Sequence, residues 1–169
     1  MTVDDLKVLY NYSHWANEKL FDVIAQLPEE AFSREVAGSF GSIRNTMVHI
    51  LSAEWGWMSR CGGPARPNKL TPDAFLTLQS LRDTFDEVRH HMQTFLDTLQ
   101  EEDLARIISY PGNAGAIRSM PLGELMQHTA NHAVHHRGQV MLMIRMLGHS
   151  PGHADMLFYF AEEHGTIAW

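Results

Sequence analysis

The stretch of sequence that decides the fold is residues 127–139, which read Gln-His-Thr-Ala-Asn-His-Ala-Val-His-His-Arg-Gly-Gln. Apolar residues at three- and four-residue spacing on both sides predict one long helix, opened by Pro121 and ending near Gly148. Residues four apart on a helix lie one above the other, about 6 Å along the axis. His128/His132 and His132/His136 are therefore overlapping pairs that can each hold a metal ion between neutral imidazoles. The stretch predicts a metal site in a helical bundle.

Length and composition predict one globular domain over residues 1–169. No apolar run approaches the length that crosses a bilayer, and the acidic N-terminus lacks the layout of a signal peptide. Cys61 is the single cysteine, so an internal disulfide is excluded. These features predict a cytoplasmic protein that has no membrane partner.

The formal net charge is −7, and the thirteen basic residues are scattered singly. A nucleic-acid surface needs clustered positive charge to displace counterions. Nucleic acid is therefore rejected as the main partner.

The rest of the chain predicts an all-α fold. Apolar periodicity predicts a first helix from about Val3 to Leu27, and Ser42 is a candidate N-cap for a second helix that ends at Gly62-Gly63-Pro64. Thr71-Pro72 predicts the start of a third helix that continues to about Leu99. A small hairpin is predicted between Ile107 and Met120, with its turn at residues 111–115, and a short helix is predicted around Asp155 to His164.

Four long amphipathic helices indicate a four-helix bundle with a short hairpin before the fourth helix and a short C-terminal helix. The connection around residues 65–70 is long enough to carry the chain back across the bundle. This connection favours a topology other than simple up-and-down order.

A helical wheel at about 100° per residue separates the histidines of the fourth helix. His136 lies roughly 50° from the centre of the apolar face and His132 roughly 90°, whereas His128 and His135 lie roughly 130–150° away. Geometry therefore favours His132 and His136 as the inward pair. His128 can be a residue that supports the site or a solvated one, and His135 has no assigned role.

A helix pair supplies two ligands, so a third must come from another element. The candidates are His14, His49, His90 and His91. His49 lies in an apolar segment of the second helix, where an unpaired imidazole is costly, but it lies at the edge of the apolar arc of that helix. Glu54 lies near the middle of that arc, and its preferred role is a buried hydrogen-bond partner. Cys61 borders a Gly-Gly-Pro turn and is expected to be exposed but not catalytic.

Other interpretations have less support. Two histidines at helical spacing occur by chance in many proteins and most such pairs bind nothing. The His-Glu-x-x-His motif of zincins is absent. A ferritin-type di-iron site needs Glu-x-x-His on two helices, and only Glu87–His90 has that spacing, which a solvated charged face explains.

Four segments resemble the DinB family of bacterial metal-binding bundles. Residues 131–139 resemble its Asn-His-x-x-His-His-Arg-Gly-Gln signature, and residues 12–17 resemble its N-terminal Tyr and Trp-Ala-Asn element. Residues 40–50 match its second-helix histidine segment, and residues 147–151 with Asp155 resemble the stretch after its fourth helix. The four segments occur in the family's order over essentially the whole chain.

This resemblance implies an up-down-down-up bundle, often a homodimer. It also implies a divalent metal ion, commonly nickel or zinc, held by three histidines that correspond to His49, His132 and His136. A related branch of thiol-dependent transferases and isomerases has a glutamate at one ligand position. That position is His132 here, so the chain resembles the DinB side of the family.

Two functions follow as hypotheses. Three protein ligands leave open positions on a metal, as in catalytic sites, which favours a metal-dependent thiol S-transferase or hydrolase that acts on a small molecule. An S-transferase activity implies a low-molecular-weight thiol as a cosubstrate. The alternative is a non-catalytic metal-binding or stress-response protein, because no general acid or base is evident beyond the ligands.

Overall fold

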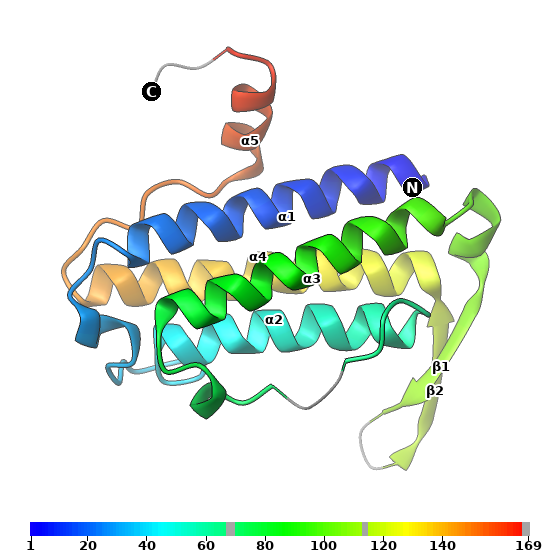
Figure 1. Ribbon diagram of the computed structural model, residues 1–169. Helices are drawn as coiled ribbons and strands as arrows, with labels where there is room; N and C mark the ends of the chain where they lie inside the picture. Colours follow the sequence, from blue (N-terminus) through cyan, green and yellow to red (C-terminus); the bar gives the residue numbers. More distant parts are fainter. Residues whose placement is uncertain (67–69, 113–114, 167–169) are drawn as a thin grey trace.

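The computed structural model describes residues 1–66, 70–112 and 115–166. In this part of the chain, five α-helices accompany a two-stranded antiparallel sheet (Figure 1). The α-helices are α1 (Val3–Ile24), α2 (Ile43–Arg60), α3 (Leu78–Thr98), α4 (Leu122–Met146) and α5 (Met156–Glu163). The strands are β1 (Ile107–Pro111) and β2 (Ile117–Pro121), and the 3-10 helices are η1 (Glu29–Phe32), η2 (Pro72–Ala74) and η3 (Glu101–Ala105).

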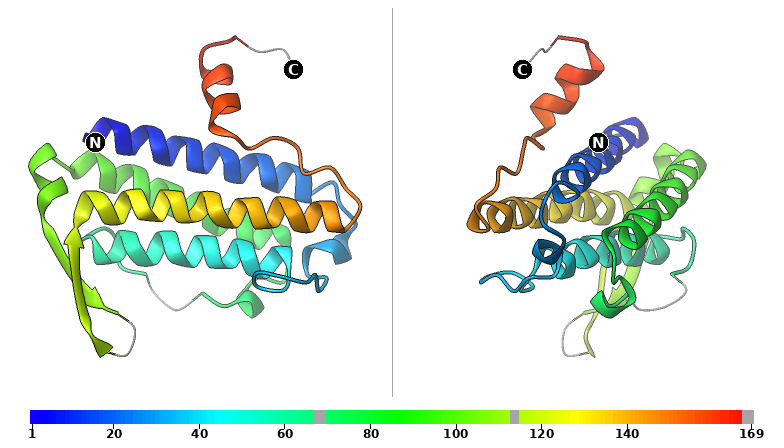
Figure 2. Two further views of the ribbon diagram at one scale, coloured as in Figure 1. Left: turned by 180° about the vertical axis from the view of Figure 1, so that it is seen from behind. Right: turned by 60° about the vertical axis from the view of Figure 1, so that its left-hand side comes forward.

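The four long helices pack together around one apolar core. α1 and α2 each contact both α3 and α4, and the three views agree on this arrangement (Figures 1 and 2). Fully buried side chains come from all four helices, among them Leu20, Met47, Leu81 and Leu122. α5 stands apart from the other helices and packs on α1 (Figure 2).

α1 begins where it is predicted and ends earlier. Thr2 and Asp5 form a reciprocal capping box, in which Thr2 Oγ1 accepts from the Asp5 amide and the Asp5 carboxylate accepts from the Thr2 amide. The helix ends at Ile24 rather than Leu27. The amides of Gln26 and Leu27 bond three residues back, because the residue before Pro28 is disfavoured in the α conformation.

α2 begins as predicted, because Ser42 Oγ accepts a hydrogen bond from the Asn45 amide. The helix ends at Arg60, followed by Gly62 at φ +103°, a conformation that favours glycine.

The predicted start of α3 at Pro72 is wrong. Pro72–Ala74 forms only a 3-10 turn, and the side chain of Thr71 makes no capping hydrogen bond. Phe75 leaves the helical conformation at ψ 80° and buries its ring in the core. Thr77 is the true cap, because its Oγ1 accepts from the Ser80 amide, and α3 begins at Leu78.

The hairpin before α4 is confirmed. β1 and β2 pair with Ser109 opposite Ser119 and Tyr110 opposite Arg118. Two residues of its predicted turn, 113 and 114, lie outside the described residues, as do residues 67–69 of the predicted connection. α4 follows Pro121 directly and ends two residues before Gly148, and α5 lies within the predicted range.

None of the helices in the described part of the chain is both long and apolar enough to span a bilayer.

Candidate metal centre

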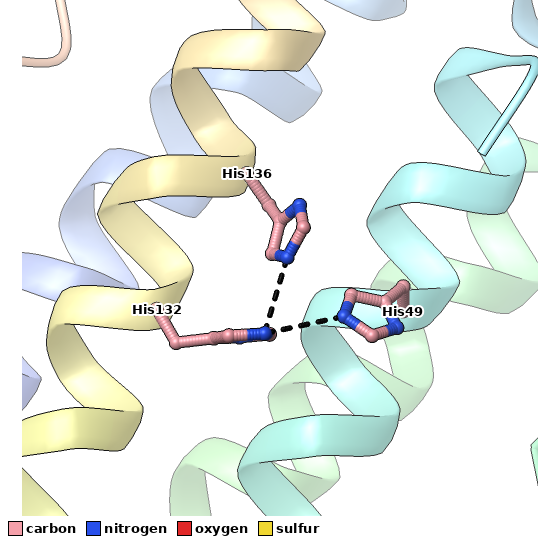
Figure 3. Close-up of side chains that lie close together, drawn as sticks. All are labelled: His49, His132 and His136. Atoms are coloured by element: carbon pink, nitrogen blue, oxygen red, sulfur yellow. Dashed lines mark hydrogen bonds between the residues drawn. The ribbon is translucent and has the colours of Figure 1, made fainter. Parts of the chain in front are cut away.

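Three imidazoles from two helices converge on one point between α2 and α4 (Figure 3). His132 Nε2 lies 3.1 Å from His136 Nε2 and 3.3 Å from His49 Nε2. All three ligand atoms lie within 4.8 Å of one another. Two nitrogens bound to one tetrahedral zinc ion at about 2.0–2.1 Å would be about 3.3 Å apart. The spacing of the rings therefore fits a single ion.

The local helix geometry explains this convergence. His132 and His136 are one turn apart on α4, so their side chains project from the same face. α2 packs along this face and presents His49 opposite the pair. His136 is buried, whereas His49 and His132 are partly buried.

The prediction from the wheel that His132 and His136 point inward agrees with this arrangement. Of the candidates for a third partner, the structure brings His49 to the pair.

Gln139 orients the His136 ring. His136 Nδ1 donates to Gln139 Oε1 at 2.6 Å, because an amide oxygen can only accept. The neutral ring therefore has its lone pair on Nε2, the atom that faces His132. The amide nitrogen of Gln139 donates to His135 Nε2 at 3.0 Å, which fixes the orientation of the amide. A hydrogen-bond acceptor behind a ligating histidine is a common feature of metal sites.

The electrostatics of the cluster favour neutral imidazoles. Burial, and secondly the nearby His136, lower the pKa of His49 below its ordinary value. Burial together with the neighbouring histidines, His136 first, lowers the pKa of His132 from 6.5 to about 4. Both rings are neutral at pH 7, and the neutral imidazole is the form that binds a metal ion.

The loop before α2 forms one wall of the cluster. The Phe40 ring stacks on His49 with a centroid separation of 4.0 Å and lies 5.5 Å from the His136 ring. Its neighbour Ser39 has a positive φ of 45°, and its Oγ donates to Gln139 Oε1 at 2.5 Å. The same glutamine therefore holds both the His136 ring and the loop that carries Phe40.

Arg137 anchors the other side of α4. Its guanidinium is buried and donates from Nη1 to Ser13 Oγ at 2.8 Å and to Asn17 Oδ1 at 3.2 Å. These bonds join α4 to α1 directly behind the histidine pair. Arg137 therefore helps to fix the rotation of α4 about its axis.

The other histidines predicted as candidates lie elsewhere. His14 Nε2 pairs with Glu54 Oε1 at 2.8 Å in the interior, which confirms the hydrogen-bond role predicted for Glu54. His90 Nδ1 bonds to the Asp86 carbonyl on the surface of α3, and His91 packs against the Trp55 ring. None of these side chains reaches the cluster.

His128 and His135 border the cluster. His128 packs its ring against His132 at 5.8 Å and against Trp57 at 5.9 Å, and it is otherwise exposed. His135 is exposed and packs against His136 at 4.9 Å.

The expected exposure of Cys61 is wrong. Its side chain is fully buried at the C-terminal end of α2, and its carbonyl accepts from Arg106 Nη2 at 2.9 Å. The turn that follows folds back over the end of the helix, with the Gly63 amide bonded to the Met58 carbonyl. Burial raises the pKa of the thiol to about 11.

We expect Cys61 to react with iodoacetamide about 100-fold more slowly in the native protein than in urea at pH 8, because a pKa near 11 leaves little thiolate. The folded thiol keeps its proton when the unfolded one ionises. The free energy of unfolding is therefore not reduced by this thiol below about pH 9, and it falls as the pH rises from about 9 to 11. Mass spectrometry of timed samples measures the rate. Equal rates in the folded and unfolded protein would contradict the burial of this thiol.

The fold and the cluster together define a class: a helical protein with a three-histidine group that is compatible with binding a divalent metal ion. The model of the DinB family matches residues 1–166. The chain therefore belongs to the DinB family, as the sequence motifs indicate.

Two relatives from Bacillus subtilis (strain 168) have similar sequences. Protein DinB is 26% identical over 158 residues, covering 89% of this chain and 91% of the relative. The uncharacterized protein YizA is 26% identical over 152 residues, covering 88% of this chain and 91% of the relative.

Two solved structures share the fold. A DinB-like protein from Bacillus cereus ATCC 10987 gives a TM-score of 0.72 at 22% identity, covering 90% of this chain and 97% of that chain. A conserved protein from Enterococcus faecalis gives a TM-score of 0.59 at 18% identity, covering 86% and 96% respectively. At these identities the likeness concerns the fold alone.

Proposed function

We propose that this protein binds one divalent metal ion, nickel or zinc, through Nε2 of His49, His132 and His136. The observation that carries this proposal is the separation of 3.1 and 3.3 Å between His132 Nε2 and the other two Nε2 atoms. Hydrogen bonding among the rings explains it less well. In the neutral ring, His136 Nε2 has no proton when Nδ1 donates to Gln139, and a single proton on His132 cannot serve two partners. A cation satisfies all three lone pairs at once.

We further propose that the centre is catalytic and acts on a small molecule, as a thiol S-transferase or a hydrolase. A divalent ion with three protein ligands has an open position, where it lowers the pKa of a thiol or a water molecule. The protein supplies the rest: Gln139 holds the His136 ring, and Phe40 covers one side of His49.

Replacing Gln139 with alanine is expected to weaken metal binding by about 10- to 100-fold, because it removes the acceptor that orients His136. Competition with a chromophoric chelator measures the affinity. Gln127→Ala is the matched control, since Gln127 is an exposed glutamine on the same helix and is not part of the three-histidine group. Equal affinities for the two variants would show that Gln139 does not position a ligand.

The nickel- or zinc-loaded protein is expected to accelerate the reaction of cysteine with 1-chloro-2,4-dinitrobenzene, in which a carbon–sulfur bond forms and chloride leaves. His136→Ala should return the rate to that of the uncatalysed reaction, because the metal is lost. The absorbance of the thioether product measures the rate. Acceleration that persists in His136→Ala would rule out the metal centre as its source. A loaded protein that gives no turnover with thiol or water nucleophiles would favour the alternative, a non-catalytic metal-binding protein.

A separate proposal concerns the direction of the four long helices. We propose an up-down-down-up order of the four long helices, supported by their connections. α1 and α2 are joined through η1 at one end of the helices, and the hairpin joins α3 to α4 at the opposite end (Figure 1).

We also propose a homodimer, for which the exposed apolar side chains of Leu142, Met146 and Leu157 offer an interface. Sedimentation equilibrium measures the mass in solution.

A further inference from the structure

A hollow lies beside the candidate metal centre, between the hairpin, the C-terminal half of α2 and the N-terminal half of α4. Its volume is about 370 Å³, which suits a small molecule. The residues that line it include two arginines, Arg60 and Arg118, and three rings, Trp57, Tyr110 and His128. No acidic residue is among the described residues that line it.

The two arginines have no ion-pair partner among the described residues. No carboxylate in residues 1–66, 70–112 and 115–166 lies within ion-pair distance of Arg60 or Arg118. Four of the twelve described lysines and arginines have such partners, and Arg60 and Arg118 are two of the other eight that lie together at one hollow. Two guanidinium groups at one concave site, without a carboxylate partner in the described part of the chain, create a local positive potential that attracts anions.

Both arginines are exposed, and each packs against a neighbouring group. The Arg60 guanidinium lies 4.9 Å from the centroid of the Trp57 ring, in a cation–π contact. The Arg118 side chain lies across Gly112, where an added Cβ would be only 2.8 Å from its Nε. The end of a helix attracts a basic residue such as Arg60, but this effect does not explain Arg118, which comes from β2.

A row of ring contacts connects this hollow with the metal centre. Trp57 packs edge-on against Tyr110 at 4.9 Å and against His128 at 5.9 Å, and His128 packs against His132 at 5.8 Å. His128 and His132 are one helical turn apart, about 6 Å along the axis. His128 therefore both lines the hollow and contacts one of the proposed metal ligands.

We propose that this hollow binds the carboxylate or phosphate group of a small organic anion, with Arg60 and Arg118 as donors and the rings of Trp57 and Tyr110 as apolar walls. That this anion is a substrate of the metal centre rests on the proposed function. Anion binding at the hollow does not rest on the proposed function, so the two proposals can fail separately. Arginine guanidinium groups match both anions through paired hydrogen bonds, and the experiment distinguishes the two.

The test is NMR titration of the ¹⁵N-labelled, metal-free protein with benzoate, phenyl phosphate and uncharged benzyl alcohol. We expect both anions to shift the Trp57 indole N–H signal, and benzyl alcohol to bind at least about tenfold more weakly. The tighter anion identifies the preferred group. Saturation by benzyl alcohol as readily as by benzoate, or no shift with either anion at millimolar concentration, would overturn the proposal.

Substitutions test whether Arg60 and Arg118 bind the anion. Arg60→Gln/Arg118→Gln should weaken anion binding about tenfold, and Arg34→Gln, an exposed arginine far along the chain, should leave it unchanged. Gly112→Ala keeps both charges but displaces Arg118, so it should also weaken binding. The affinity for zinc should be unchanged in all three variants, which separates this site from the metal centre. Anion affinity that is the same in wild type and the double variant would overturn the proposal.

Discussion

Replacing His132 and His136 with alanine is expected to weaken the binding of zinc or nickel by at least about 1,000-fold. This exceeds the 10- to 100-fold loss that follows removal of an outer hydrogen-bond partner, because the double variant lacks two of three proposed ligands. Competition titration with a chromophoric chelator measures both affinities. Circular dichroism should show unchanged helix content, since alanine favours the helix.

The matched control removes two other histidines from the same helix. His128→Ala/His135→Ala deletes exposed rings that pack beside the cluster but do not contribute Nε2 to it. Its affinity should stay within about tenfold of wild type, the lower end of outer-partner effects. Equal losses in the two double variants would mean that the histidines bind metal as a nonspecific cluster.

Replacing Glu54 with alanine is expected to lower the free energy of unfolding by about 3–5 kcal/mol, the range for removing one partner of a buried pair. Glu54 and His14 are both buried and lie 2.8 Å apart. His14 Nδ1 already has no hydrogen-bond partner among the described residues. The substitution would leave both nitrogens of a buried ring without a partner. Urea denaturation followed by circular dichroism measures the change.

Glu87→Ala is the control for this prediction, because Glu87 is exposed near the middle of α3. It should change the free energy of unfolding by less than about 0.5 kcal/mol. Glu54→Gln retains an oxygen acceptor and should cost less than Glu54→Ala. If Glu54→Ala were as stable as Glu87→Ala, the interior pair would not stabilise the fold.

Local sequence signals predicted most of the fold and failed where tertiary packing competes with them. Ser42 predicted the start of α2, and Pro121 the start of α4. Thr71-Pro72 carries an equally good capping signal, but the burial of Phe75 interrupts the helix until Thr77. Nothing in the local sequence ranks one threonine above the other.

The site was predictable in part. The spacing of His132 and His136 on one helix is a local property, so a wheel identifies the pair. His49 was one of four candidates for the third ligand, because the residue that reaches the pair depends on how α2 packs against α4. The resemblance to the DinB family selected it.

The roles of two side chains of the site, Gln139 and Phe40, were not predicted, and the exposure of Cys61 was mistaken. Gln139 lies three residues after His136, a spacing that puts the two side chains side by side on a helix and that could have identified it. Phe40 comes from a loop and gave no comparable signal. The burial of Cys61 was mistaken because the turn after α2 folds back over the helix end, which depends on packing.

The most direct test of the central claim is the metal content of untagged protein, measured by elemental mass spectrometry. We predict near-stoichiometric nickel or zinc in the wild-type protein and almost none in His132→Ala/His136→Ala. A folded wild-type protein that holds no metal, even after reconstitution with either ion, would contradict the assignment of His49, His132 and His136 as ligands.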